Sequence, residues 1–404
     1  MPEKGYSMST ATSETKLLSH GLLWFGAALS IAEIFTGTLF APLGFEQGVI
    51  AILLGHIIGG FLFFLAGLIG ANTRRSAMET VRIGFGRQGA SGFALANVLQ
   101  LIGWTTVMII TGAAATNAIL PWGTAVWSLV IGVLIILWLV LGYSNLTRLN
   151  LVAVALLFCL TIWLSFIIFD PSSAVAGALQ LTEDQGLSFG AAVELAAAMP
   201  LSWLPLVSDY TRTAKRPVAA TVVSTLTYTI VSIWMYIIGL GSAIYAGETD
   251  IAAVMLKTGL GLWPLLIIIF ATVTTTYLDA FSAGVSFVSI FPKLSEKTTA
   301  ISLTVLGIVL AILVPMTEYE NFLFLIGSVF TPMIAILFTQ YFLLKQDASG
   351  RKFYLPNLIL WLVGFVLYRN VMTYETPLGT TFPVMIVIAV LTYIVGRFTG
   401  KIQD

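Results

Sequence analysis

The sequence is poor in charge, cysteine and histidine. Asp, Glu, Lys and Arg make up 9% of its 404 residues, whereas soluble domains carry about 25%. A single cysteine cannot form an intrachain disulfide, and two histidines far apart in the chain do not indicate a zinc site. Basic and acidic residues balance at 19 each, so no net positive charge indicates nucleic-acid binding. These shortages exclude a water-soluble protein and argue against disulfide, zinc and nucleic-acid chemistry.

The chain is rich instead in long apolar runs. Hydrophobic residues make up 58% of it, and the mean hydropathy is +0.97. A membrane-spanning helix needs about 20 apolar residues. The runs between Gly, Pro and charged residues predict an all-α polytopic membrane protein with about twelve spans. The spans lie near residues 20–45, 48–71, 91–119, 123–142, 150–169, 189–208, 218–246, 253–290, 299–316, 319–343, 353–371 and 379–398. The eighth is too long for one straight crossing and is expected to contain a helix plus an interfacial or bent extension.

Basic residues are distributed unevenly between the two ends of these spans. If both termini are cytoplasmic, all of the 19 Lys and Arg residues except Lys257 and Arg369 lie on the cytoplasmic side. Lys and Arg concentrate in cytoplasmic loops of membrane proteins. We therefore expect an even number of spans in the lipid bilayer of a prokaryotic cytoplasmic (inner) membrane, with both termini in the cytoplasm.

Three carboxylates fall deep inside the predicted spans. Glu33 lies in the first span, Glu194 in the sixth and Asp279 in the eighth. A charged side chain inside the bilayer costs several kcal/mol, so each residue is a candidate functional group. A structural pair or cap facing the bundle interior is the alternative for Glu33 and Asp279. Glu194 is predicted nearer the outer surface, where a wetted pore mouth or a structural contact would explain it.

Two spans carry the signs of interrupted helices. The first places small residues around Glu33 at mid-span, and the sixth contains Pro200 and Pro205, which lack backbone donors. Breaks in corresponding spans of two halves indicate a transporter's binding site, although ordinary kinks would give the same pattern. We expect a cytoplasmic tail at 1–19, five-span repeats of opposite orientation at 20–169 and 189–343, two C-terminal spans at 353–398, and a tail at 399–404.

The third span carries an amide and an indole on one helix face. Gln100 and Trp104 are four residues apart, so they project from the same side. An indole can stack on a flat heteroaromatic ring, and an amide can both donate to and accept from it. Hydrogen bonding between helices and simple packing of the indole are the alternative.

The eighth span carries adjacent hydroxyls that suit a sodium ion. Thr274 and Thr275, with the carbonyl of Ala271 one turn earlier, offer the oxygen ligands that a hard cation prefers. They could meet the carbonyls of Gly26 and Leu29 where the first span opens. Buried Thr hydroxyls also bond commonly to their own helix, which is the alternative.

With these residues in view, the chain resembles the nucleobase–cation symporter family, secondary transporters that include cytosine and hydantoin permeases. The resemblance covers essentially the whole chain, and within the family it is strongest to the branch proposed to import hydroxymethylpyrimidine, a thiamine precursor. The most specific motif is the segment that closes the sixth span. The motifs are Phe35-Thr36-Gly37, Gln100 with Gly103-Trp104, Ser208-Asp209-Tyr210-Thr211-Arg212, and Thr274-Thr275.

The resemblance implies a LeuT-like five-plus-five inverted-repeat core with two additional C-terminal helices and alternating access around a midplane site. It also implies a substrate ring held between an aromatic of span 3, matched by Trp104, and one of span 6. At the second position this chain has Pro200, and Trp203, about one turn later, takes the role in our interpretation. Thr276 stands where the family has an asparagine, with Asp279 one turn beyond. These departures argue against plain cytosine or hydantoin transport.

The predicted function is cation-coupled import of a small pyrimidine, most simply hydroxymethylpyrimidine. Glu33 or Asp279 would accept a hydrogen bond from the exocyclic amine and, if protonated, share the proton with the ring. The Thr pair favours Na⁺ as the coupling ion, the carboxylates favour H⁺, and no other cofactor is expected. Asp209 is expected to brace the inner gate through an ion pair.

Other functions remain as alternatives. The first is a permease for cytosine, another nucleobase or a hydantoin, and the second is an amino-acid carrier of similar architecture. An intramembrane enzyme would need a nucleophile–base pair or a metal cluster at depth, which the two distant histidines and Cys159 do not supply. A channel would need rings of like residues or filter loops, and the sequence shows neither.

Overall fold

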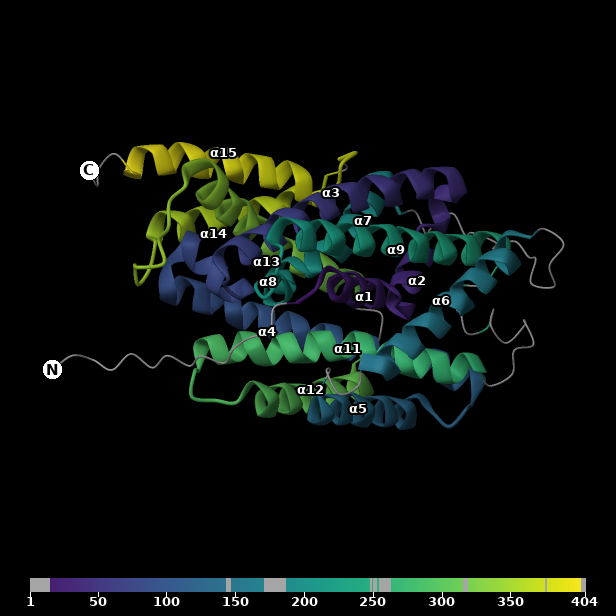
Figure 1. Cartoon of the computed structure of the whole chain (residues 1–404). Helices are drawn as coiled ribbons and strands as arrows, with labels where there is room; N and C mark the ends of the chain where they lie inside the picture. Colours follow the sequence, from purple (N-terminus) through teal and green to yellow (C-terminus); the bar gives the residue numbers. More distant parts are fainter. Residues whose placement is uncertain are drawn as a thin grey trace.

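The computed structural model describes residues 15–142, 147–170, 187–247, 249, 253, 263–314, 319–374 and 376–400. In this part of the chain nearly all regular structure is helical, and most helices run along one common direction (Figure 1). The helices are α1 (Leu17–Ala28), α2 (Ile31–Thr38), η1 (Ala41–Leu43), α3 (Gly44–Thr73), α4 (Ala77–Ile119), α5 (Thr124–Leu141), α6 (Thr147–Phe169), α7 (Phe189–Ser202), α8 (Leu204–Thr211), α9 (Pro217–Tyr245), α11 (Trp263–Ile290), α12 (Glu296–Leu313), α13 (Tyr319–Phe338), η4 (Thr339–Leu344), α14 (Leu355–Val371) and α15 (Thr381–Gly400).

Nine helical stretches of the described residues are long and apolar enough to cross a membrane, and three shorter apolar helices accompany them. The predicted all-α polytopic class is thereby confirmed. Helix boundaries differ from the predicted spans by a few residues in most places, but α4 begins at Ala77 rather than near residue 91. The bent extension expected before α11, the residue Lys257 and most of both predicted tails lie outside the described residues.

The first span is broken, as its small residues and mid-span carboxylate predict. Helix α1 ends at Ala28, and α2 begins at Ile31 after an extended Ser30 with φ −131° and ψ 151°. The Ser30 hydroxyl accepts a hydrogen bond from the backbone N–H of Glu33 at 3.2 Å. An N-cap of this kind satisfies a donor that the helix start leaves unpaired, so the break is built into the local sequence.

The sixth span is also broken, between α7 and α8, at Trp203. Pro205 stands in the first turn of α8, where a missing backbone N–H costs least. Two carbonyls at this break are satisfied from α4: Gln100 Nε2 donates to Ser202 O at 2.8 Å, and Asn97 Nδ2 donates to Pro205 O at 3.1 Å. The prolines therefore interrupt the helix, and amides of a neighbouring helix stabilise the interruption.

The broken helices lie inside the bundle. In Figure 1, α14 and α15 lie along one edge and α5 and α12 along the opposite edge, with α1 between them. Glycines allow α2 and α9 to approach closely: a Cβ on Gly37 would lie 2.2 Å from Tyr236 O, and one on Gly239 would lie 1.9 Å from Ile34 O. Small residues permit such close helix contacts in membranes, and this contact places the α1–α2 break against α9.

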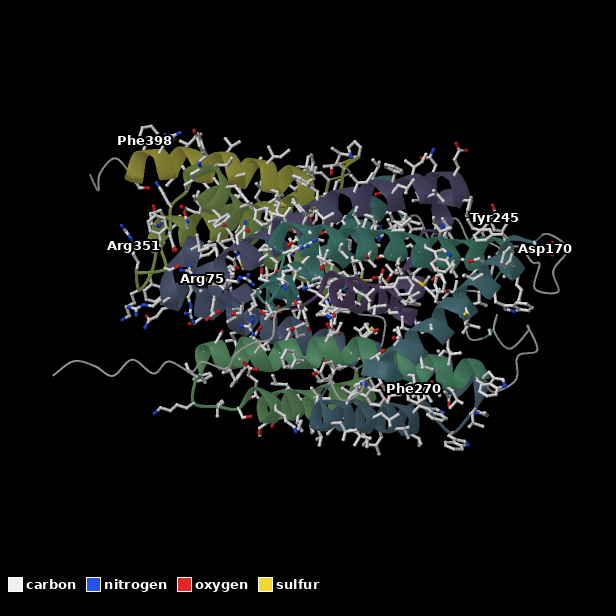
Figure 2. All side chains as sticks on the ribbon, viewed as in Figure 1. Arg75, Asp170, Tyr245, Phe270, Arg351 and Phe398 are labelled. Carbon is white, nitrogen blue, oxygen red and sulfur yellow. The ribbon has the colours of Figure 1, made fainter. Side chains whose placement is uncertain are left out.

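Charged side chains separate toward the two ends of the bundle. Arg75 and Arg351 lie at one end and Asp170 at the other (Figure 2). This arrangement agrees with the uneven distribution of basic residues along the sequence. The membrane orientation and the bounds of the two repeats remain predictions.

Candidate functional site

A buried cavity lies where the two helix breaks meet. It is small, with a volume of about 20 Å³ open to the centres of water molecules, which is room for about one water. A six-membered ring needs more space, so the cavity has to widen to hold a ligand. The lining residues come from both breaks and from α4 and α11, namely Ala27, Ser30, Ala32, Glu33, Trp104, Met108, Met199, Ser202, Trp203, Thr275 and Asp279.

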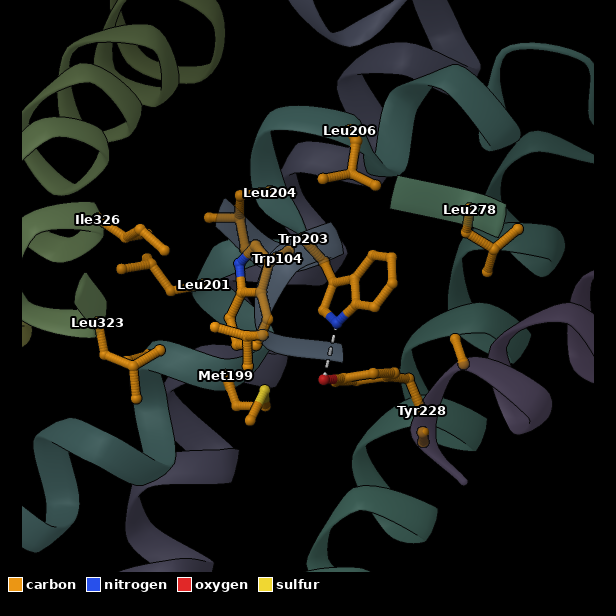
Figure 3. Close-up of a cluster of buried hydrophobic side chains, with 14 of the residues drawn as sticks. Trp104, Met199, Leu201, Trp203, Leu204, Leu206, Tyr228, Leu278, Leu323 and Ile326 are labelled. Carbon is orange, nitrogen blue, oxygen red and sulfur yellow. Dashed lines mark hydrogen bonds between the residues drawn. The ribbon is translucent and has the colours of Figure 1, made fainter. Parts of the chain in front are cut away.

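Two indoles face this cavity from different helices. Trp203 occupies the α7–α8 break itself and donates its indole N–H to the hydroxyl of Tyr228 at 2.9 Å (Figure 3). Its ring also packs edge-to-face on Trp24, with centroids 5.3 Å apart. Trp104 comes from α4 and packs edge-to-face on Phe322, with centroids 5.6 Å apart. The break thus positions one aromatic wall, and an unbroken helix positions the other.

Glu33 is the most extensively hydrogen-bonded polar residue of the lining. Its side chain is 2% exposed. Oε1 accepts from the hydroxyl of Tyr228 at 2.8 Å, and Oε2 lies 2.6 Å from the hydroxyl oxygen of Ser232. The Ser232 oxygen lies 2.7 Å from Nε2 of His56, whose Nδ1 lies 2.9 Å from the carbonyl of Ile52. A carboxylate at the cavity is therefore connected to a fully buried histidine.

Three predicted ligand residues lie behind the lining rather than in it. Gln100 is buried and uses Nε2 for Ser202 O and for Asn97 Oδ1. Pro200 packs against α3, where a Cβ on Gly59 would lie 2.3 Å from Pro200 Cγ. Thr276 donates its hydroxyl to Thr272 O on its own helix at 2.6 Å. The structure therefore brings Glu33, Trp104, Trp203 and Asp279 together at the cavity and leaves Gln100, Pro200 and Thr276 outside its lining.

Neutral oxygens gather where the end of α1 meets α11. The hydroxyl of Thr275 lies 3.3 Å from Gly26 O, and that of Thr274 lies 3.0 Å from Ala271 O. Leu29 is fully buried just after the end of α1. Carbonyls and hydroxyls of this kind fit a monovalent hard cation, and broken helices hold such ions in transporters. No group of three or more His, Cys, Asp or Glu residues able to hold a metal occurs in the described ranges.

Asp209 does not form the predicted ion pair. Its Oδ1 accepts the backbone N–H of Ala77 at 2.9 Å, at the start of α4. Within the described part of the chain, the one ion pair closer than 4 Å joins Arg75 and Asp347, at 3.3 Å. The prediction is wrong because a free N–H at a helix start offers the carboxylate a partner that spacing along the sequence does not reveal.

Glu194 has structural partners. It is 1% exposed, and Oε2 accepts the backbone N–H groups of Thr380 and Thr381, each at 2.7 Å. Oε1 accepts from the Thr381 hydroxyl at 2.6 Å and also from the Tyr368 hydroxyl. The carboxylate therefore connects α7 to the N-terminus of α15, which is the structural alternative considered for it.

Sequence reasoning missed the partners of Glu33. Tyr228 and Ser232 are four residues apart on α9 and so share a helix face, a pattern that would have indicated a polar stripe. His56 was noted only as one of two distant histidines, although an ionisable residue inside an apolar span is itself a functional signal. Their convergence on Glu33 depends on how α2, α3 and α9 pack.

The comparisons with known proteins agree with this geometry. A family model described as "Permease for cytosine/purines, uracil, thiamine, allantoin" matches residues 11–396. The chain belongs to this family. It is an integral membrane transporter, not an enzyme, and its substrate is a small molecule. The cytosine permease of Escherichia coli (strain K12) is 25% identical over 333 residues, which cover 81% of this chain and 76% of that one.

Solved structures show the same fold. Mhp1, a nucleobase-cation-symport-1 family transporter in a closed conformation with bromovinylhydantoin bound, superimposes with a TM-score of 0.81 at 18% identity. The match covers 97% of this chain and 94% of Mhp1. A Na⁺-coupled sialic acid symporter gives a TM-score of 0.70 at 16% identity, covering 96% of this chain and 90% of the symporter. The expected LeuT-like fold class is confirmed.

Proposed function

We propose that the protein is a cation-coupled importer of a small pyrimidine, with hydroxymethylpyrimidine as the first candidate, and that it works by alternating access. The observation that carries this proposal is the buried cavity at the two helix breaks, lined by Trp104 and Trp203 and by the carboxylates Glu33 and Asp279. Substrate sites of secondary transporters are formed by discontinuous helices. The distribution of basic residues supports cytoplasmic termini, and the similarity to the cytosine permease of Escherichia coli supports an inner-membrane location in a prokaryote.

The ring of the substrate lies between Trp104 and Trp203 in this proposal. Each oxygen of Glu33 lies within hydrogen-bond distance of one hydroxyl and has a further lone pair, so Glu33 as a carboxylate can accept an N–H of an exocyclic amine. Asp279 offers a second acceptor on α11. Gln100, Pro200 and Thr276 act from behind the lining by fixing the α7–α8 break and α11.

The coupling ion in this proposal is Na⁺, held between α1 and α11. The carbonyls of Gly26, Leu29 and Ala271 and the hydroxyls of Thr274 and Thr275 are the ligands. The Thr275 hydroxyl lies 3.3 Å from Gly26 O across the two helices, whereas the Thr274 hydroxyl donates to Ala271 O of its own helix at 3.0 Å. A bound cation would fix the end of α1 to α11, next to the substrate cavity. Protons are the competing coupling ion because two carboxylates line the same cavity.

Cytosine is the second candidate substrate. The alignment with the cytosine permease of Escherichia coli covers 81% of this chain at 25% identity. Cytosine and hydroxymethylpyrimidine both carry an exocyclic amine next to a ring nitrogen, so the same carboxylate can recognise either. They differ in their other ring substituents, and these must decide between them.

Thermal-shift binding to the purified protein tests the proposal. Hydroxymethylpyrimidine, cytosine, thiamine and hydantoin are each added with and without Na⁺. A ligand at about 100 times its Kd stabilises the folded form by about 2.7 kcal/mol. We expect hydroxymethylpyrimidine to raise the unfolding midpoint, and more so with Na⁺. A larger shift with cytosine would favour the second candidate, and no shift with any pyrimidine would contradict the proposal.

Two neighbouring threonines test the sodium site. The hydroxyl of Thr275 faces Gly26 on α1, whereas that of Thr276 bonds to its own helix. Thr275→Ala therefore removes about one cation ligand, which we expect to cost about 1.4 kcal/mol. The factor by which Na⁺ raises the affinity for the substrate should fall about tenfold as a result. Thr276→Ala is the matched control and should retain the dependence. Equal effects of both substitutions would contradict the proposed ligands.

A further inference from the structure

His56, Ser232 and Glu33 form an unbroken hydrogen-bonded row from α3, across α9, to the cavity wall. The row is buried, since Glu33 is 2% exposed and both other residues are fully buried. Its two internal contacts measure 2.7 Å, from His56 Nε2 to Ser232 Oγ, and 2.6 Å, from Ser232 Oγ to Glu33 Oε2. The proposed binding of a substrate to Glu33 uses neither Ser232 nor His56.

The ends of the row have fixed hydrogen-bond directions. A carbonyl oxygen only accepts, so Nδ1 of His56 must donate to Ile52 O, at 2.9 Å. The Tyr228 hydroxyl accepts the indole N–H of Trp203, so it donates its own proton to Glu33 Oε1. The neighbouring groups do not fix which atom donates in the two inner hydrogen bonds, those between Glu33 Oε2, Ser232 Oγ and His56 Nε2.

One proton shared between Glu33 and His56, in addition to the Ser232 hydroxyl hydrogen, can complete these two hydrogen bonds in two ways. If Ser232 donates to Glu33, then His56 Nε2 must donate to Ser232, and the row holds an imidazolium and a carboxylate. If Ser232 donates to His56, then Glu33 is protonated and donates to Ser232, and both ends are neutral. Without the shared proton, two acceptors compete for one hydroxyl hydrogen. With a second proton, the hydroxyl hydrogen has no acceptor.

The titratable groups around the row do not supply a counter-charge. On α9, Tyr228 contacts Glu33, and the ring of Tyr236 packs edge-to-face on His56 with centroids 4.8 Å apart. On α11, Asp279 lines the same cavity as Glu33.

Two further carboxylates come from helices that pack on α3. Glu194 of α7 is bound by α14 and α15, and Asp209 of α8 by the start of α4.

Separated charges in a low-dielectric interior are costly. The neutral arrangement is therefore the resting one in the absence of ligand.

We propose that this row is a proton store that adjusts the charge of Glu33 to the ligand, an inference that rests on the proposed binding of an aminopyrimidine at the cavity. When an N–H of the exocyclic amine reaches Glu33, the Glu33 O–H bond breaks and its proton goes to Ser232 Oγ. The original Ser232 proton moves to His56 Nε2. Glu33 becomes a carboxylate acceptor and His56 its counter-charge, with no proton exchanged with water.

Cytosine binding as a function of pH tests this transfer in His56→Gln. The glutamine amide can still bond to Ile52 O and Ser232 but cannot take up a proton. Wild-type affinity is expected to change less than about twofold from about pH 6 to about pH 8, because the proton stays inside the protein. In His56→Gln, Glu33 must release its proton to water. Affinity should therefore rise with pH by up to about tenfold per unit.

Two serines on α9 provide a second variant and a control. Ser232→Ala removes the bridge and should show the same pH dependence as His56→Gln, which keeps the test open if one variant fails to fold. Ser224 is equally buried but bonds to Ala220 O in its own helix, so Ser224→Ala should keep the flat wild-type profile. A flat profile in both His56→Gln and Ser232→Ala would overturn the proposal.

Infrared spectroscopy can detect the stored proton before any ligand is added. Without ligand, wild-type protein should show a protonated-carboxyl C=O band that is absent in Glu33→Gln. Cytosine should abolish this band in wild type but not in His56→Gln. No difference between ligand-free wild type and Glu33→Gln would overturn the stored proton. If neither cytosine nor hydroxymethylpyrimidine binds, both the proposed function and the ligand-driven proton transfer are wrong. The band of the ligand-free protein still shows in that case whether Glu33 holds the stored proton.

Discussion

Glu194 is expected to stabilise the docking of α15 on the transporter core, and Glu194→Gln measures its contribution. The substitution keeps the shape but removes the charge. The amide NH₂ can turn toward the two hydroxyls, which can accept, so the remaining oxygen still meets the N–H groups of Thr380 and Thr381. Hydrogen bonds to a charged acceptor contribute about 1.5–3 kcal/mol each and neutral ones about 0.5–1.5. Two such bonds therefore lose about 2 kcal/mol together.

The position of Glu194 at a helix start adds to this loss. Thr381 is the first residue of α15, and a negative charge at a helix N-terminus is favourable by about 0.3–1 kcal/mol or more when partly buried. The total expected decrease in the free energy of unfolding is therefore about 2–3 kcal/mol. Tyr368→Phe, which removes one donor to the same carboxylate, should cost about 1.5–3 kcal/mol.

Denaturant-induced unfolding of the purified protein in detergent is the assay. Glu46 is exposed in the first turn of α3, so Glu46→Gln serves as the control for the loss of a solvent-exposed charge at a helix start and should cost no more than about 1 kcal/mol. In the double variant of Glu194→Gln and Tyr368→Phe, the loss should be smaller than the sum of the single losses, because both act on one network. A Glu194→Gln variant as stable as the control would refute the reasoning.

Substitutions at three further positions test the packing and the site. Gly37→Ala places a methyl group 2.2 Å from Tyr236 O, so we expect a loss of about 1–3 kcal/mol in unfolding free energy, measured in the same assay. Asn97→Ala removes the amide that donates to Pro205 O and Ser286 Oγ and accepts from Gln100, and we expect a loss of about 1–3 kcal/mol; a cost near zero would mean that water replaces the amide. Trp104→Ala should weaken cytosine binding by at least about 1 kcal/mol, or about fivefold, whereas Trp104→Phe should retain part of the stacking. Unchanged affinity in Trp104→Ala would remove this indole from the proposed site.

The helix breaks show how far local sequence information reaches. Ser30 caps α2 within three residues of the break, and Pro205 stands in the first turn of α8, two residues after Trp203. Capping and the missing proline N–H act on the chain within one turn. The positions of both interruptions, and therefore the region of the cavity, could be predicted without knowledge of the neighbouring helices.

The side-chain contacts that stabilise the helix ends and breaks could not be predicted from local sequence. Gln100 was assigned to the ligand because it shares a face with Trp104, yet it donates to Ser202 O, 102 positions away in the chain. Asp209 was assigned to an ion pair, yet it accepts the N–H of Ala77. In each case a backbone group freed at a helix end or break competes for the side chain, and its position is set by packing.

The sequence by itself determined the class of the protein, its spans, the two interrupted helices and the residues able to do chemistry at membrane depth. These follow from apolar length, helix capping and the cost of buried charge, which are properties of short segments. Only the tertiary structure decided which of those residues meet. Tyr228 reaches Glu33 across 195 positions, and Thr381 reaches Glu194 across 187, because the rotation and close approach of packed helices are set by many distant contacts together.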